Sequence, residues 1–168
     1  MPFFFLLRGV LTTGGKQLDS SIVGVIGSSL ASGRPYDDAV EVGRLVAGKG
    51  AMVLTGGLGG VMEAACKGAK EAGGHTIGIL PGFDTRDANK YVDIPIITGL
   101  NHARNIIVVR SSDVLIAVGG EYGTLSEIAF AMKLGKTVIS LGSWDVGEGI
   151  KKASDPTEAV AMAMDAIK

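Results

Sequence analysis

The sequence has a single cysteine, no long hydrophobic run and no cluster of basic residues. One thiol, Cys66, cannot build a disulfide or a cysteine-based metal site within the chain, and this usage favours a reducing, cytoplasmic compartment. Residues 3–7 are apolar, but they are too few to span a membrane, and Arg8 follows them, whereas a signal peptide has its basic residues first. The 16 basic and 17 acidic residues form no basic stripe, so nothing favours a nucleic acid polymer as a partner.

Glycine, in contrast, is abundant, with 26 residues among 168. The glycines have no three-residue period, which excludes a collagen-like chain. The apolar fraction of 46% argues against a disordered chain. Within a packed domain, glycines mark turns with positive φ or close approaches of the backbone.

From Ser21 onward, short β-branched runs alternate with segments of helical periodicity. Pro95 interrupts one run, which predicts an edge or terminal position. Asp155, Pro156 and Glu158 have the order typical of a helix start. We predict strands at 22–27, 51–54, 75–80, 92–97, 113–118 and 136–141, helices at 36–49, 61–72, 101–110, 124–134 and 155–168, and a loop at 142–154.

Continuously apolar strands separated by helices are typical of a parallel sheet covered on both faces. We therefore predict a single doubly wound three-layer α/β/α Rossmann-like domain, with a mainly parallel sheet of six to seven strands. The domain is expected to occupy residues 21–168, and residues 1–20 are expected to be a flexible N-terminal extension.

Three glycine-marked loops follow predicted strands, at residues 27–29, 55–60 and 119–124. In such sheets ligands bind beyond the carboxyl ends of the strands, and a helix N-terminus there offers free N–H groups to a phosphate. The loops match neither a P-loop nor a complete dinucleotide fingerprint. They are either tight turns of a compact fold or the floor of a site for a small phosphorylated ligand, and we favour the site.

Several side chains near these loops have two possible roles. A lone arginine such as Arg104 usually lies on the surface, and Thr124 and Glu127 have the spacing of a capping box, which needs no ligand. His75 is expected to be structural, whereas His102 could face the site. The apolar row at residues 106–109 suits either the core or an oligomer interface. Two separated histidines and one cysteine do not form a metal-ligand cluster, so no structural metal is expected.

Five segments carry a family resemblance, at residues 54–57, 60–63, 78–82, 101–104 and 119–127. Through these segments the sequence resembles the LOG superfamily of SLOG Rossmann-like proteins, long labelled "possible lysine decarboxylase". The resemblance covers about residues 22–141. Lysine decarboxylation normally uses pyridoxal phosphate held by a lysine, and we see no lysine offered at the strand ends, so we expect no pyridoxal phosphate.

Within this superfamily, residues 67–85 and 92–100 look most like the molybdenum cofactor carrier branch. That likeness implies a non-catalytic protein that binds and protects a phosphorylated pterin. One alternative is a LOG-type nucleoside 5′-monophosphate phosphoribohydrolase, in which Arg104 and Glu127 would be catalytic. Another is a nucleotide-binding sensor. The resemblance also implies a homo-oligomer, either a dimer or a tetramer.

The chain departs from the phosphoribohydrolase motif Pro-Gly-Gly-x-Gly-Thr-x-x-Glu. It has Gly119 in place of the proline, Glu121 in place of the second glycine of the pair, and Asn105 where the enzymes usually have lysine. These changes put hydrolysis in doubt. The candidate ligand-binding residues are Gly27, Ser28, Ser29, Gly56, Gly57, Gly60, Arg104, Gly119, Gly120, Glu121, Tyr122, Gly123, Thr124 and Glu127.

Overall fold

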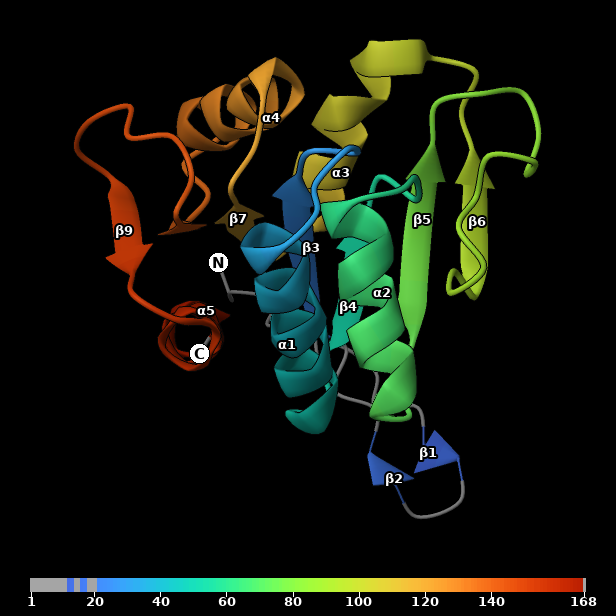
Figure 1. Cartoon of the computed structure of the whole chain (residues 1–168), viewed down its shortest axis with the longest axis horizontal. Coiled ribbons are helices and arrows are strands. Elements are labelled where there is room, and N and C mark those ends of the chain that lie inside the picture. The colour runs from blue at the N-terminus through green and yellow to red at the C-terminus, as the bar shows by residue number, and fades with distance from the viewer. Residues whose placement is uncertain (1–11, 14–15, 18–20, 168) are drawn as a thin grey trace, which may run out of the picture.

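The computed structural model describes residues 12–13, 16–17 and 21–167 (Figure 1). Strands β1 (Thr12–Thr13) and β2 (Lys16–Gln17) pair antiparallel with each other. The expectation that residues 1–20 form a flexible extension otherwise lies outside the described residues.

Among the described residues, seven strands form one parallel sheet in the order β6-β5-β4-β3-β7-β8-β9 (Figure 1). The chain enters this sheet at the central strand β3 and adds β4, β5 and β6 toward one edge. It then returns to place β7 on the other side of β3 and adds β8 and β9 toward the opposite edge. This doubly wound order confirms the predicted fold class, and the point at which the order reverses lies between β3 and β7. The strands are β3 (Ile22–Gly27), β4 (Met52–Thr55), β5 (Thr76–Leu80), β6 (Ile94–Ile97), β7 (Val114–Val118), β8 (Val138–Leu141) and β9 (Ile150–Ala153).

Helices cover both faces of the sheet. In Figure 1, α1 (Arg34–Gly48) and α2 (Val61–Glu71) lie in front of the strands, and α5 (Pro156–Ile167) packs beside α1. The other face carries α3 (Asn105–Ser111), preceded by the 3₁₀ turn η1 (Asn101–Arg104), and α4 (Tyr122–Lys133).

The core is divided between these two faces because side chains alternate along each strand. Val25 and Ile116 pack in the cluster under α1, α2 and α5, whereas Ile26 and Leu115 pack in the cluster under α3 and α4. The central strands β3 and β7 are therefore apolar on both sides, as their sequences predict.

The sequence prediction is wrong for residues 142–154, which include the edge strand β9. Its residues are half-buried or exposed, and Lys151 and Lys152 stand where an internal strand would have apolar residues. The strand forms because its backbone pairs with β8. At the opposite edge, the prediction for Pro95 is confirmed, because β6 is an edge strand. The predicted helix start is also confirmed, since the Asp155 carboxylate accepts a 2.9 Å hydrogen bond from the Glu158 N–H.

Helices α1 and α2 approach each other through two glycines. A Cβ atom at Gly43 would collide with the carbonyl of Ala65, and one at Gly68 would collide with the carbonyl of Val40. Backbone therefore packs directly against backbone at this crossing. The contact fixes the position of α2, whose N-terminus lies at the end of β4.

We predict that Gly43→Ala destabilises the protein by about 1–3 kcal/mol, because the added methyl group forces α1 and α2 apart. Gly48→Ala is the matched control. It lies in the same helix with open space around it, and it should stabilise the protein by up to about 1 kcal/mol through helix propensity. Urea unfolding followed by circular dichroism measures both. Equal stability of the two variants would contradict the close helix contact.

Candidate functional site

The three glycine-marked loops meet at the carboxyl ends of β3, β4 and β7, around the point where the strand order reverses. They surround a pocket of about 170 Å³, which is smaller than the ~300 Å³ at which typical ligand sites begin. The pocket can therefore enclose only one part of a ligand. Its lining residues are Gly27, Ser28, Ser29, Leu58, Met62, His102, Asn105, Glu121, Gly123, Thr124 and Glu127.

The first loop follows β3 and packs against the start of α2. A Cβ atom at Gly27 would lie 2.6 Å from the Val118 carbonyl oxygen and 2.6 Å from a Val61 methyl group. Only glycine allows β3, β7 and α2 to meet this closely. The Ser28 carbonyl accepts a 3.0 Å hydrogen bond from the Val61 N–H, so this loop is held against the first residue of α2.

The second loop follows β4 and uses two left-handed glycines. Gly57 has φ 75° and Gly60 has φ 60°, conformations that other residues rarely adopt. The Thr55 hydroxyl accepts a 3.0 Å hydrogen bond from the Gly57 N–H and begins the turn. A Cβ atom at Gly60 would collide with the Ser28 carbonyl, so the first two loops are in direct contact.

The third loop turns β7 into α4. Gly119 has φ 53° and Gly120 has φ 122°, and Glu121 immediately precedes the helix. Leu125 provides the first N–H group that forms a helical hydrogen bond in α4, and it donates to the Glu121 carbonyl. The N–H groups of the first helical turn therefore face the end of the sheet, where they can serve an anionic ligand.

The capping-box interpretation of Thr124 and Glu127 is wrong. Helix α4 begins at Tyr122, so Thr124 is its third residue rather than its cap, and no side chain caps this helix. Both side chains are instead buried against the pocket. Tyr122 is 81% exposed, and its ring lies 6.0 Å from the Trp144 ring, outside the pocket lining.

Arg104 is buried, which contradicts the expectation that a lone arginine lies on the surface. Its guanidinium lies directly over Gly56, where a Cβ atom would collide with it. Its nearest carboxylate is that of Glu127, with 3.9 Å between Nη1 and Oε1, and its buried Nε has no hydrogen-bond partner among the described residues. A buried guanidinium with unused donors favours an acceptor supplied by a ligand.

Burial also changes how Glu127 ionises. Its removal from water raises the pKa of the carboxyl group to about 8, and the Arg104 charge opposes this shift only in part. Burial lowers the pKa of Arg104, but an arginine in a protein remains a cation. At neutral pH the pair is therefore a cation beside a largely protonated carboxyl group.

Asn105 lines the pocket, although it was not among the site residues predicted from the sequence. Its side-chain amide donates to the Ser126 hydroxyl at 3.0 Å and to the Gly123 carbonyl at 3.4 Å, which joins α3 to the first turn of α4. The sequence signal that could have identified Asn105 as a pocket residue is its position next to Arg104. His102 faces the pocket, as expected, while His75 is exposed just before β5. Leu58 and Met62, which were not among the candidate residues, add an apolar side.

Some of the predicted ligand-binding residues lie beside this pocket and do not line it. Gly56 lies under Arg104, and Gly57 and Gly60 shape the second turn. Gly119 lines a neighbouring groove of about 380 Å³. The remaining lining residues of this groove are Arg34, Pro35, Asp38, Leu141, Gly142, Ala153 and Ser154.

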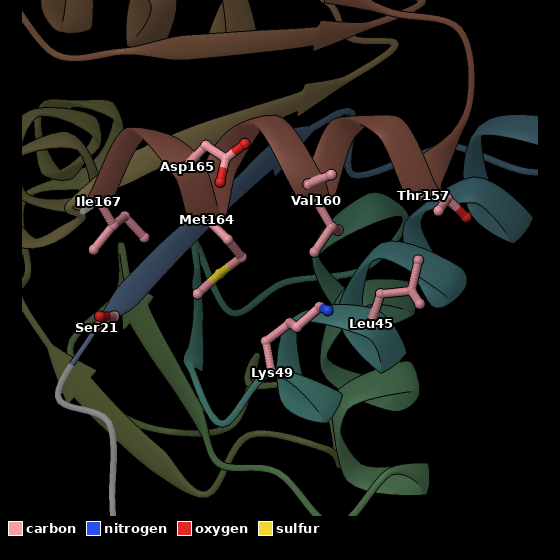
Figure 2. Close-up of a pocket in the computed structure, with 9 residues that line it drawn as sticks. Ser21, Leu45, Lys49, Thr157, Val160, Met164, Asp165 and Ile167 are labelled. Atoms are coloured by element: carbon pink, nitrogen blue, oxygen red, sulfur yellow. The ribbon is translucent and has the colours of Figure 1, made fainter.

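A larger groove of about 690 Å³ lies between α1 and α5 (Figure 2). Leu45, Val160 and Met164 give it an apolar lining, and Ser21 marks the beginning of β3 at its side. This groove lies toward the amino ends of the strands, and none of the glycine-marked loops lines it. The smaller pocket is therefore the better candidate, because parallel sheets bind ligands at the carboxyl ends of their strands.

The described residues offer neither a cluster of metal ligands nor a membrane-spanning helix. No group of three or more histidine, cysteine, aspartate or glutamate residues there could hold a metal ion. No helix in that part of the chain is long and apolar enough to cross a membrane.

We predict that Glu127→Gln removes a pH dependence of stability. Between about pH 4.5 and 8 the folded protein retains a proton on Glu127 that the unfolded chain has lost, so the free energy of unfolding falls as pH rises through this window. The slope from this group is on the order of 1 kcal/mol per pH unit. Urea unfolding at pH 5, 6, 7 and 8 should show Glu127→Gln gaining stability over wild type as pH rises. Parallel pH profiles would contradict the buried, protonated carboxyl group.

Solved structures similar to this chain include proteins of the molybdenum cofactor carrier branch that the sequence resembles. The structure of the molybdenum cofactor binding protein from the phototrophic bacterium Rippkaea orientalis matches with a TM-score of 0.85 and 41% identity, covering 90% of this chain and 99% of that chain. The Moco carrier protein from Chlamydomonas reinhardtii matches with a TM-score of 0.81 and 40% identity, covering 89% and 98%.

A probable cytokinin riboside 5′-monophosphate phosphoribohydrolase of Oryza sativa subsp. japonica is 38% identical over 109 residues, which are 61% of this chain and 47% of that protein. The chain thus matches about half the length of this relative. The model of the SLOG cluster 4 family matches residues 20–167, nearly the whole described domain. The chain therefore belongs to the SLOG cluster 4 family.

Proposed function

We propose that this protein is a non-catalytic binding and carrier protein for the molybdenum cofactor, a phosphorylated pterin. The observation that carries the proposal is the full-length likeness, at about 40% identity, to two proteins named for binding or carrying this cofactor. The likeness extends over 98–99% of those chains, so nearly all of each carrier chain has a counterpart here.

The chemistry of the pocket fits such a ligand. The first turn of α4 provides N–H groups for a phosphate, and Gly119 and Gly120 allow the backbone to approach it. Arg104 adds a buried cation with an unpaired donor. Glu121 carries a negative charge beside this turn, but its side chain is exposed and can turn into water. The pterin would lie toward the loops at Gly27 and Gly56.

We also propose that the protein is a homo-oligomer. Helix α4 combines a buried side with exposed Tyr122 and Phe130, and Leu134 is exposed just after it. A helix that is apolar on most of its surface is usually covered on more than one side. At residues 106–109, Val108 and Val109 are in the core, which agrees with the core alternative, while Ile106 and Ile107 are only half-buried. A second copy of the chain would cover this side.

Native mass spectrometry of the protein from its own cells should show a multiple of the chain mass, with one phosphorylated pterin carrying molybdenum per chain. Gly120→Ala should lower cofactor retention at least about ten-fold, because a methyl group at φ 122° strains the loop and meets Thr124. Gly48→Ala, far from the pocket, should retain it. Wild-type protein that neither carries the cofactor nor protects it from oxidation would contradict the proposal.

A phosphoribohydrolase is the second candidate, and the Arg104–Glu127 pair is the observation that favours it. Both residues match the positions that the enzymes use, and the structure brings them within 3.9 Å of each other in the pocket. In this reaction an ionised Glu127 would stabilise positive charge developing on the ribose, while Arg104 would hold the phosphate and ribose. Because the pKa of Glu127 is about 8, little of the active form would exist at neutral pH.

Incubation with AMP, followed by chromatography of released adenine, separates the two candidates. The carrier proposal predicts no release above a protein-free control at pH 7. A hydrolase predicts release that increases as pH rises toward 8 and beyond, and that falls at least about 100-fold in Glu127→Gln. Glu158→Gln, an exposed change at the start of α5, is the matched control. Release that is unchanged in Glu127→Gln would exclude the assigned mechanism.

A further inference from the structure

Asn89, in the segment between β5 and β6, forms hydrogen bonds to the second glycine loop. Its backbone N–H donates to the Gly57 carbonyl at 2.9 Å. Its side-chain amide donates to the same carbonyl at 3.2 Å and to the Leu58 carbonyl at 2.9 Å. Two successive carbonyl groups of the turn are therefore held toward Asn89.

This arrangement also determines where the N–H groups of the turn point. In a planar trans peptide the N–H group points opposite to the carbonyl of the same unit. When Asn89 binds the carbonyls of Gly57 and Leu58, the N–H groups of Leu58 and Gly59 are directed away from it. Neither N–H group donates to another described residue, and Leu58 lines the pocket. Two free donors thus lie beside the N-terminus of α2.

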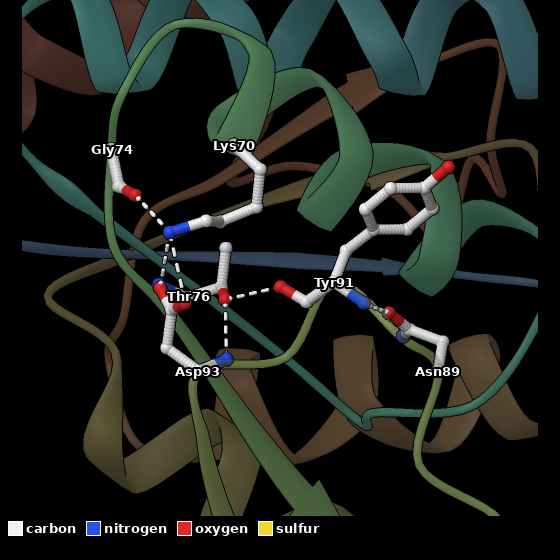
Figure 3. A network of polar contacts seen from close by, with 6 residues as sticks. All are labelled: Lys70, Gly74, Thr76, Asn89, Tyr91 and Asp93. Carbon is white, nitrogen blue, oxygen red and sulfur yellow. Dashed lines mark hydrogen bonds and ion pairs between the residues drawn. The ribbon is translucent and has the colours of Figure 1, made fainter.

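A second network anchors the segment that carries Asn89 (Figure 3). The buried Thr76 hydroxyl donates to the Tyr91 carbonyl at 2.6 Å and accepts from the Asp93 N–H at 2.9 Å. Lys70 reaches Asp93 from α2 with a 2.9 Å hydrogen bond. The Asn89 side-chain oxygen accepts from the Tyr91 N–H at 3.1 Å. Asn89 is therefore held at both its backbone and its side chain.

We propose that Asn89 is a positioning residue of the candidate site, which presents the N–H groups of Leu58 and Gly59 to an anionic group of the ligand. The proposal deepens the proposed function, because it rests on a ligand that carries phosphate. Asn89 itself does not line the pocket, and it acts through the turn. Gly57 contributes to this positioning, since its left-handed backbone brings its carbonyl to Asn89.

The test compares Asn89→Asp with Val160→Ala in NMR titrations with inorganic phosphate. In wild type, the backbone amides of Leu58 and Gly59 should shift with added phosphate. Asn89→Asp places a carboxylate against two carbonyl oxygens, so those shifts should disappear and the dissociation constant should increase at least about ten-fold. Asn89→Gln, which keeps the amide, should recover part of the affinity.

Val160→Ala is the matched control, because it removes buried methyl groups of α5 and leaves every Asn89 contact in place. It should lower the unfolding midpoint in urea but keep phosphate affinity within about two-fold. The proposal is wrong if phosphate does not shift the Leu58 and Gly59 amides of wild type, if Asn89→Asp retains the affinity, or if affinity in both variants simply follows stability.

The same variants separate this proposal from the proposed function. If phosphate shifts the two amides of wild type but not those of Asn89→Asp, and the molybdenum cofactor is not retained, the positioning role holds and the carrier function fails. If wild type and Asn89→Asp retain the cofactor equally, the carrier function holds and the positioning role fails.

Discussion

The candidate site depends on the burial of the Arg104 guanidinium against the backbone of Gly56. Removing a cation from water costs several kcal/mol unless partners replace the lost hydration. Here the replacement is incomplete, since Glu127 lies 3.9 Å away and the Arg104 Nε has no partner among the described residues. Stability alone does not favour such an arrangement. It is better explained by a ligand that supplies the missing acceptors.

The glycines around this pair have different physical roles. Gly56 is small so that Arg104 can lie over the backbone, and Gly27 is small so that two strands and a helix can meet. Gly57 and Gly120 are needed for their positive φ. Gly123 has open space where a Cβ would be, so packing of the described residues does not require a glycine there. At this helix N-terminus within the pocket, the open space beside Gly123 leaves room for the proposed ligand.

Sequence patterns were sufficient to predict the central strands, the strand-end loops and the edge position of Pro95, because apolar runs and glycine positions follow directly from local chemistry. They were insufficient for β9, whose pairing comes from its neighbour β8 and not from its own apolar content. Arg104 was predicted poorly for the same reason, since its burial depends on Gly56 and Glu127, which lie far from it in sequence. The contacts of Asn89 with Gly57 span 32 residues, and no motif indicates them.

The protonation of Glu127 bears directly on the choice between carrying and hydrolysing a ligand. With a pKa of about 8 the carboxyl group is largely neutral at pH 7, so it can donate a hydrogen bond to a bound acceptor but supplies little negative charge. A phosphate near Arg104 would raise this pKa further, because negative charges in one site oppose each other. Ligand binding would thus strengthen the donor and weaken the base. The protonation of Glu127 is therefore consistent with the proposed carrier role, whereas cleavage of a glycosidic bond would need the ionised form of this residue.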